Sequence, residues 1–138
     1  MYVAKKVAAG EHLLDYRGVI TLEEHECRES DYTLLFVEEG TPRLTLDAAK
    51  CGNEARFIND FRNTGRKANC RFAERFDSRG VRHMGVYALV ALAKGEELLL
   101  SYGKGYWTAR ATAQPATGGS GGEVEECAMP EAVGRGGR

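Results

Sequence analysis

Long apolar runs are missing from this sequence of 138 residues. No stretch approaches the roughly 18 to 20 apolar residues that a transmembrane helix needs, and the first ten residues lack the apolar core of a signal peptide. With 28% charged and 43% hydrophobic residues, the composition is that of a soluble globular protein. It excludes a coiled coil and a wholly disordered chain, and we expect an intracellular protein.

Closely spaced cysteines are also missing. Cys27, Cys51, Cys70 and Cys127 lie 24, 19 and 57 residues apart and form no CxxC or CxC pair. Structural zinc sites normally draw their ligands from such pairs. His25 and Cys27 make one weak ligand pair without a second half. We therefore expect reduced thiols and no metal site.

Aromatic residues are absent from the end of the chain. All 12 of them lie between Tyr2 and Trp107, whereas the last 28 residues hold 7 of the 17 glycines. Such a segment cannot bury enough apolar surface to offset the loss of chain entropy. We predict one folded domain over residues 1–110 and a disordered Gly/Ala-rich tail over residues 111–138. About 110 residues are enough for a single modest core.

The formal net charge is only −1, but the two signs are segregated. Residues 11–40 hold nine acidic against two basic side chains, and residues 62–82 hold seven basic against two acidic. Two solvated faces are the simplest interpretation. The alternative is an acidic wall that receives a basic peptide, together with a basic edge that faces an anion or a nucleic acid.

Short runs of β-branched, aromatic and leucine residues recur between glycine and proline turn signals, which predicts a mostly β domain. The predicted strands cover residues 12–16, 32–37, 43–46, 70–73, 84–92 and 97–102. Helix is scarce. We expect one short helix over residues 22–28 and a turn over residues 53–58, with Asn53 as its cap. No internal repeat is present.

Two segments carry most of the functional information: GNEARFIND at residues 52–60 and KGEELLLSYG at residues 94–103. They resemble the "GN.ARFINH" and "GEEL…Y" motifs of the SET domain, the catalytic domain of a family of protein-lysine methyltransferases. Asn69 stands where that family has a downstream "PN", and AGEHLLDYRGVI at residues 9–20 is similar to its early "aGe.v.eY.Ge.i" stretch. The resemblance implies a SET-domain, β-clip-like fold of short strands with a C-terminal pseudoknot.

The sequence departs from the family in four places. The glycine-x-glycine loop that cradles the methionine part of S-adenosylmethionine precedes the segment matched by Tyr2 to Val7, so we expect this loop to be missing and cofactor binding to be weak. Asp60 replaces the motif histidine. The interval from Asn59 to Asn69 is longer than usual, and no cysteine cluster follows the domain, so no zinc is expected.

Lysine methylation is an in-line displacement by a neutral amine, although the reference pKa of lysine is near 10.4. A narrow aromatic channel disfavours the ammonium form and aligns the amine lone pair. The resemblance implies that Tyr102 is the catalytic tyrosine and that Tyr16 is the second tyrosine of the channel. Core packing is the alternative role for each.

The resemblance also implies a cofactor site and a substrate channel. The predicted cofactor-binding residues are Asn59, Asp60, Tyr102 and Trp107, with main-chain atoms of Asp60 making much of its contact. The predicted channel residues are Tyr32, Phe57, Leu100 and Tyr106, with Phe36 as a further wall residue. Arg56 is expected to buttress the loop. Each aromatic among them has packing as its alternative.

The leading hypothesis is therefore an S-adenosylmethionine-dependent protein-lysine N-methyltransferase that acts on a basic peptide, a histone tail being the usual substrate. Its location would then be nuclear, and we expect a monomer. One alternative is a catalytically inactive SET module that binds peptides or protein partners. A nucleic-acid edge at residues 62–82 is a third reading, but only Phe72 and Phe76 offer stacking surfaces there, so no specific nucleic acid is expected.

Overall fold

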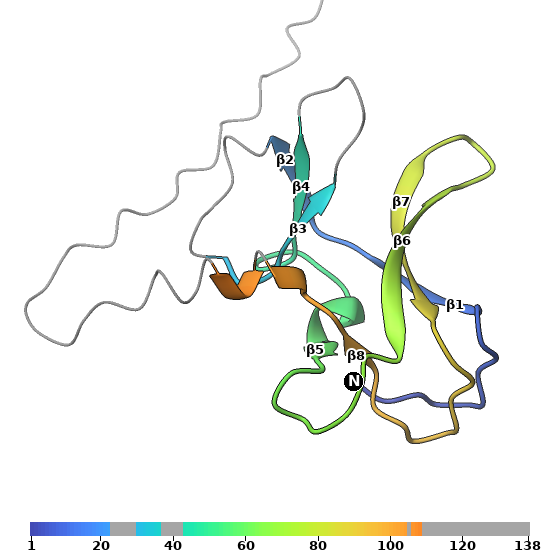
Figure 1. Cartoon of the computed structure of the whole chain (residues 1–138). Coiled ribbons are helices and arrows are strands. Elements are labelled where there is room, and N and C mark those ends of the chain that lie inside the picture. The colour runs from blue at the N-terminus through green and yellow to red at the C-terminus, as the bar shows by residue number, and fades with distance from the viewer. Residues whose placement is uncertain (23–29, 37–42, 105, 109–138) are drawn as a thin grey trace, which may run out of the picture.

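The computed structural model describes residues 1–22, 30–36, 43–104 and 106–108, and the described chain is built almost entirely of short strands (Figure 1). The elements are β1 (His12–Tyr16), β2 (Val19–Leu22), β3 (Thr33–Phe36), β4 (Leu44–Asp47), the 3₁₀ helix η2 (Glu54–Phe57), β5 (Asn59–Asp60), β6 (Cys70–Phe76), β7 (Arg82–Ala88) and β8 (Leu99–Leu100). Residues 103–104 and 106–108 are also helical. The prediction of a mostly β fold is confirmed.

The strands form three small sheets. Two are antiparallel, with strand orders β1-β7-β6 and β2-β4-β3, and the third pairs β5 with β8 in parallel. The longest strands, β6 and β7, make a hairpin whose turn is organised by Asp77. One carboxylate oxygen of Asp77 accepts the backbone N–H groups of Arg79 and Val81, both at 2.9 Å. Gly80 has φ +77°, which a residue without a Cβ adopts at no steric cost.

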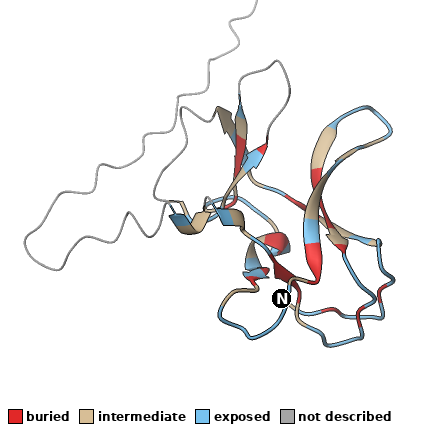
Figure 2. Ribbon diagram, in the orientation of Figure 1, coloured by how far each residue is buried: buried red, intermediate tan, exposed pale blue. Residues whose placement is uncertain are grey.

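The core lies where these sheets meet, around β8, η2 and the start of β6 (Figure 2). Burial of apolar side chains from separate sheets is what holds such short strands together, because a two- or three-stranded sheet is marginal by itself. The largest fully buried side chains are Ile58, Leu99, Leu100, Val86, Thr45 and Cys70.

The segment that contains β8 is hydrogen-bonded along both edges. The Leu100 carbonyl accepts the Phe61 N–H at 2.9 Å, and the Leu99 carbonyl accepts the Asn69 N–H at 3.0 Å. Successive residues of a strand direct their backbone groups to opposite edges, so these partners lie on opposite sides of β8. The loop over residues 61–68 must therefore cross from one side of this late segment to the other, which is the predicted pseudoknot.

Asn69 completes this arrangement with its side chain. Its amide nitrogen donates to the Glu97 carbonyl at 2.8 Å, and its amide oxygen accepts the Leu99 N–H at the same distance. The side chain is mostly buried, so it substitutes for a neighbouring strand. The sequence motif placed an asparagine here, and the structure shows why an amide is suited to the position.

Several predicted boundaries were wrong. Strand β7 ends at Ala88 and not at residue 92, β6 continues to Phe76, and only Leu99 and Leu100 of the predicted strand 97–102 are extended in a ladder. Strands β2 and β5 were not predicted. Leu22 ends β2, and the rest of the predicted helix 22–28 lies outside the described residues, as does the predicted tail over residues 111–138.

Replacing Asn69 with alanine tests the double-sided pairing of β8. The variant leaves the Glu97 carbonyl and the Leu99 N–H without their partner, and we expect it to lower the free energy of unfolding by about 2 to 4 kcal/mol. Asn59→Ala is the control, because the exposed Asn59 amide makes one contact, to Glu97 at 3.1 Å, and its loss should cost less than about 1 kcal/mol. Urea denaturation measures both, and equal effects would contradict the assignment.

Candidate active site

Tyr16 is the last residue of β1 and points into the protein. Its side chain is buried, its ring packs edge-on against Phe72 at a centroid distance of 5.6 Å, and its hydroxyl donates to the Tyr32 carbonyl at 2.6 Å. Since neighbouring residues of a strand face opposite ways, Asp15 lies on the other face. The alternation of side chains along β1 thus places the Tyr16 ring on one face of the strand and the Asp15 carboxylate on the other.

Asn53 holds the backbone on both sides of Tyr16. Its amide nitrogen donates to the Asp15 carbonyl at 2.7 Å, and its amide oxygen accepts the Arg17 N–H at 3.2 Å. Asn53 occupies the predicted N-cap position of η2, but its side chain makes no capping hydrogen bond and is used on β1 instead. At Gly52 a Cβ would lie 2.7 Å from the Ala48 Cβ and 3.1 Å from the Arg17 carbonyl oxygen, so glycine lets this segment pack against the residues that follow β4 and β1.

Tyr102 follows β8 and is fixed at two points to the segment around β5. Its backbone N–H donates to an Asp60 carboxylate oxygen at 2.7 Å, and its hydroxyl donates to the Ile58 carbonyl at 2.6 Å. The Tyr106 ring packs edge-on against the Tyr102 ring at a centroid distance of 4.9 Å. The ring of Tyr102 is therefore held from both ends.

Burial, with a smaller contribution from the nearby Tyr102 hydroxyl, raises the pKa of Tyr16 to about 12. Burial likewise raises the pKa of Tyr102 to about 12, with contributions from Tyr106, Asp60 and Tyr32. Electrostatic influences thus connect the four predicted site tyrosines, Tyr16, Tyr32, Tyr102 and Tyr106, which come from three segments of the chain. Both phenols stay protonated at neutral pH.

The other predicted channel residues divide into two groups. Tyr32 and Phe57 lie at the surface beside Arg56, whose guanidinium carbon is 4.0 Å from the Tyr32 ring centroid and 5.6 Å from that of Phe57. Arg56 also donates to the Ala49 carbonyl at 3.0 Å, which agrees with the expected buttressing contact. Leu100 and Phe36 are instead part of the hydrophobic core.

The predicted cofactor residues gather around Asp60. Asp60 is bonded to Tyr102 as described, and the Trp107 indole lies close enough to help lower the pKa of its carboxyl, although outside hydrogen-bond geometry. The buried indole nitrogen of Trp107 has no hydrogen-bond partner among the described residues. The exposed Asn59 amide donates to Glu97 at 3.1 Å. The structure therefore brings Asp60, Tyr102 and Trp107 together, whereas the Asn59 side chain is exposed and contacts Glu97.

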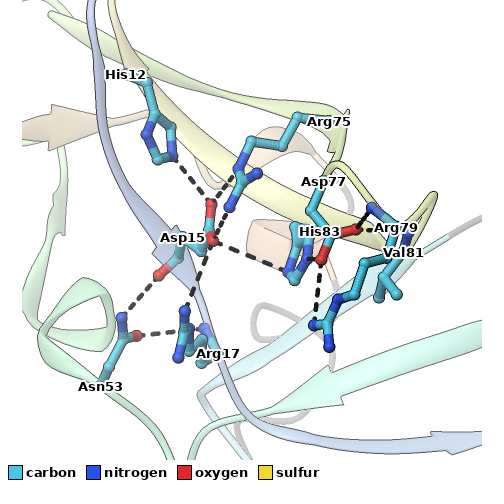
Figure 3. Close-up of polar contacts among 9 residues, drawn as sticks. All are labelled: His12, Asp15, Arg17, Asn53, Arg75, Asp77, Arg79, Val81 and His83. Carbon is cyan, nitrogen blue, oxygen red and sulfur yellow. Dashed lines mark hydrogen bonds and ion pairs between the residues drawn. The ribbon is translucent and has the colours of Figure 1, made fainter.

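On the other face of β1, the buried Asp15 carboxylate is the centre of a charged cluster (Figure 3). It accepts two hydrogen bonds from Arg75, one of them at 2.7 Å, and lies 2.9 Å from the His12 ring nitrogen. Arg17 and His83 lie 3.9 Å away. The Arg75 hydrogen bond is the largest influence and, with His12, lowers the pKa of Asp15 to about 2 against the opposing effect of burial.

The basic stretch 62–82 is largely neutralised within the described part of the chain. Five of its arginines pair with carboxylates, namely Arg62 with Asp60, Arg66 with Glu97, Arg75 with Asp15, Arg79 with Asp77 and Arg82 with Glu74. One of these pairs, Arg75 with Asp15, joins the basic stretch to the acidic stretch 11–40. Residues 23–29 and 37–40 of the acidic stretch lie outside the described residues.

Among the residues that the structure describes, no group of three or more metal-ligating side chains is placed to hold a metal ion, and no helix is long and apolar enough to cross a membrane. Cys51 and Cys70 are free thiols. Burial raises the pKa of Cys70 to about 12, which keeps this thiol unreactive. His25, Cys27 and Cys127 lie outside the described residues.

Comparison with known proteins agrees with this geometry. Residues 1–103 match the SET domain. The chain is 31% identical over 107 residues to the histone-lysine N-methyltransferase trithorax of Drosophila virilis, and equally so to that of Drosophila melanogaster. Each alignment covers 74% of this chain, and the chain spans about 3% of the length of these relatives. The chain belongs to the SET domain family.

Sequence reasoning missed two residues that shape the site, Asn53 as a clamp on β1 and Arg62 as the partner of Asp60. The sequence motif drew attention to Asn53 but did not indicate that its side chain bonds the backbone of β1. For Arg62 the signal was its spacing, since an arginine two residues after a buried aspartate can reach back to the same carboxylate.

Asp15 makes the stability of the fold pH-dependent in acid. Its pKa in the folded state, about 2, is below the ordinary value of 3.8, so the charged carboxylate contributes about 2 kcal/mol above pH ~4, and this contribution is lost as the pH falls toward 2. We expect Asp15→Asn to lower the free energy of unfolding at pH 7 and the difference from wild type to shrink below pH ~4. Urea denaturation across this range measures it; a pH-independent difference would show that the charge is unimportant.

Proposed function

We propose that this chain is a protein-lysine N-methyltransferase that transfers a methyl group from S-adenosylmethionine to a lysine in a basic protein segment. The observation that carries the proposal is the pair Tyr16 and Tyr102: one buried and one half-buried phenol, both protonated, close enough to influence each other, and each bonded to a backbone carbonyl at 2.6 Å. Membership of the SET domain family supports the same reaction class.

In the proposed reaction the amine nitrogen attacks the methyl carbon, the carbon–sulfur bond breaks, and a neutral thioether leaves. The amine must be uncharged when it attacks. Because the pKa of each tyrosine is about 12, neither hydroxyl is ionised to act as a base at neutral pH. Loss of the lysine proton is instead favoured by the aromatic surroundings, which disfavour a charged ammonium.

The tyrosine hydroxyls would orient the amine. A hydroxyl has one hydrogen to donate and two lone pairs that accept. The Tyr16 hydroxyl donates its hydrogen bond to the Tyr32 carbonyl, and the Tyr102 hydroxyl donates to the Ile58 carbonyl. Lone pairs on both hydroxyl oxygens therefore remain to accept hydrogens of the amine. Two fixed acceptors align the nitrogen lone pair along the line of attack.

S-adenosylmethionine, when bound, supplies a methyl group on a positively charged sulfur. The site around Asp60 fits such a molecule. The buried indole nitrogen of Trp107, which has no hydrogen-bond partner among the described residues, is a donor available to a bound group, and the exposed Asn59 precedes Asp60 on β5. The Asp60 carboxylate is engaged by Tyr102 and Arg62, so its contribution to the cofactor would come from main-chain atoms.

We propose a histone tail as the substrate, which would place the protein in the nucleus. The names of the two relatives support this choice, since both are histone-lysine N-methyltransferases. The excess of acidic residues over residues 11–40 matches a basic peptide.

Tyr102→Phe tests the proposal. It removes one hydroxyl that orients the amine, and we expect methyl transfer to a lysine-containing histone peptide to fall by about 100- to 1,000-fold, as when one donor of a preorganised site is lost. Tyr87→Phe is the matched control: Tyr87 lies on β7, where its ring contacts His12 and Arg71, and its rate should be unchanged. Transfer of labelled methyl measures both, with thermal unfolding to check the fold.

The other outcomes are equally informative. Full turnover by Tyr102→Phe would mean that another group orients the amine. A wild-type chain that binds the peptide but transfers no methyl group when S-adenosylmethionine is added would favour the alternative of a catalytically inactive SET module that binds peptides.

A further inference from the structure

We propose that Asp60 and Arg62 act together as positioning residues, Asp60 for Tyr102 and Arg62 for Trp107. The inference rests on the proposed function for its catalytic consequence, but the contacts themselves are independent of it. Asp60 lies on β5, Arg62 follows it by two residues, and Tyr102 and Trp107 come from the later segment that pairs with β5.

The Asp60 carboxylate receives three N–H groups. One oxygen accepts the Arg62 backbone N–H at 2.7 Å, and the other accepts the Tyr102 backbone N–H at 2.7 Å and the Arg62 guanidinium at 2.9 Å. Asp60 is 9% exposed. A buried carboxylate with both oxygens engaged in this way has one orientation, so the backbone of Tyr102 is held in one place.

Arg62 extends this anchor to the aromatic residues that follow Tyr102. Its guanidinium carbon lies 5.7 Å from the Trp107 ring centroid and 5.2 Å from that of Phe61. Because Asp60 holds the guanidinium, the cation has a fixed position against the indole ring, and contacts of this kind are attractive. The ion pair therefore links the backbone of Tyr102 to the ring of Trp107.

An aspartate is suited to position 60 because of the number of hydrogen bonds that a carboxylate can accept. A neutral imidazole offers one acceptor nitrogen, whereas a carboxylate offers two oxygens with about four lone pairs. Only the carboxylate can accept both backbone N–H groups and still pair with Arg62. The departure from the histidine of the SET motif and the arginine two residues later thus form one matched feature of this chain.

The consequence for Tyr102 is geometric. Its hydroxyl is bonded to Ile58 and its N–H to Asp60, so its two anchors are two residues apart on one segment. Without the Asp60 anchor the side chain of Tyr102 keeps its hydroxyl bond to Ile58 and its contact with Tyr106, but no side chain fixes its backbone, so the position of its hydroxyl is less well defined. Orientation of the amine depends on the position of this hydroxyl, so we expect kcat, and not peptide affinity, to suffer.

The test compares three variants of the full chain: Asp60→Asn, Arg62→Gln and Asp77→Asn. An asparagine has one acceptor oxygen, so Asp60→Asn cannot satisfy the N–H groups of both Tyr102 and Arg62. Arg62→Gln keeps both of these backbone bonds and removes only the cation. Asp77→Asn is the matched control, because Asp77 also accepts two backbone N–H groups but lies in the β6–β7 turn, at the far end of the hairpin from β8 (Figure 1).

Two readouts need neither substrate nor cofactor: hydrogen exchange at the Tyr102 amide and the fluorescence of Trp107, the single tryptophan. We expect Asp60→Asn to speed exchange of that amide by about tenfold or more, as for loss of a hydrogen bond to a charged group. Arg62→Gln should leave this exchange unchanged but alter the Trp107 fluorescence. In turnover, Asp60→Asn should lower kcat about tenfold or more, with the KM for peptide within about threefold.

Normal Tyr102 exchange in a folded Asp60→Asn variant would overturn the proposal, as would an equal effect of Asp77→Asn, which would indicate general destabilisation. If Asp60→Asn does not fold, Arg62→Gln still tests the proposal. Unchanged Trp107 fluorescence in Arg62→Gln would overturn the positioning of the indole by Arg62. Altered fluorescence with normal exchange of the Tyr102 amide would support the assignment of Arg62 to Trp107 and of Asp60 to Tyr102. If the wild-type chain shows no methyl transfer, the proposed function fails while the exchange and fluorescence results still decide the positioning role.

Discussion

The pairing of the segment around β8 on both of its edges is the constraint on which the rest of the structure depends. This segment comes late in the chain, yet it lies between β5 and Asn69, and it carries Tyr102 at its end. Leu99 and Leu100 are also among the most deeply buried side chains. The same few residues thus close the core and deliver the proposed catalytic tyrosine, so stability and site geometry cannot be varied independently here.

Buried carboxylates organise the two sides of the proposed site. Asp15, next to Tyr16, is held by Arg75, and Asp60, bonded to Tyr102, is held by Arg62. A buried charge is tolerated only when it is paired and hydrogen-bonded, so each aspartate fixes its surroundings in one arrangement. Tyr16 and Tyr102 themselves carry no charge at neutral pH, because burial keeps their pKa values near 12.

The sequence predicted the β class, most strand positions and the identity of the motif residues, because alternation and motif spacing are local signals. It did not predict β2 or β5, which are too short or too exposed to show a pattern. Nor did it predict what Asn53 and Asp60 hold, because their partners are 38 and 42 residues away in the sequence. Leu100 was expected in the channel by motif position, and the structure places its side chain in the core; only tertiary packing decides which way such a side chain faces.

The central claim is that Tyr16 and Tyr102 are held as neutral hydroxyls in one partly buried site. The most direct test is a pH titration followed by NMR, with the ring carbon that bears the hydroxyl labelled in tyrosine and each signal assigned by Tyr→Phe substitution. The account predicts that both residues remain protonated well above pH 10, with pKa values near 12. Titration of either residue near the ordinary value of 10 in the folded protein would contradict it.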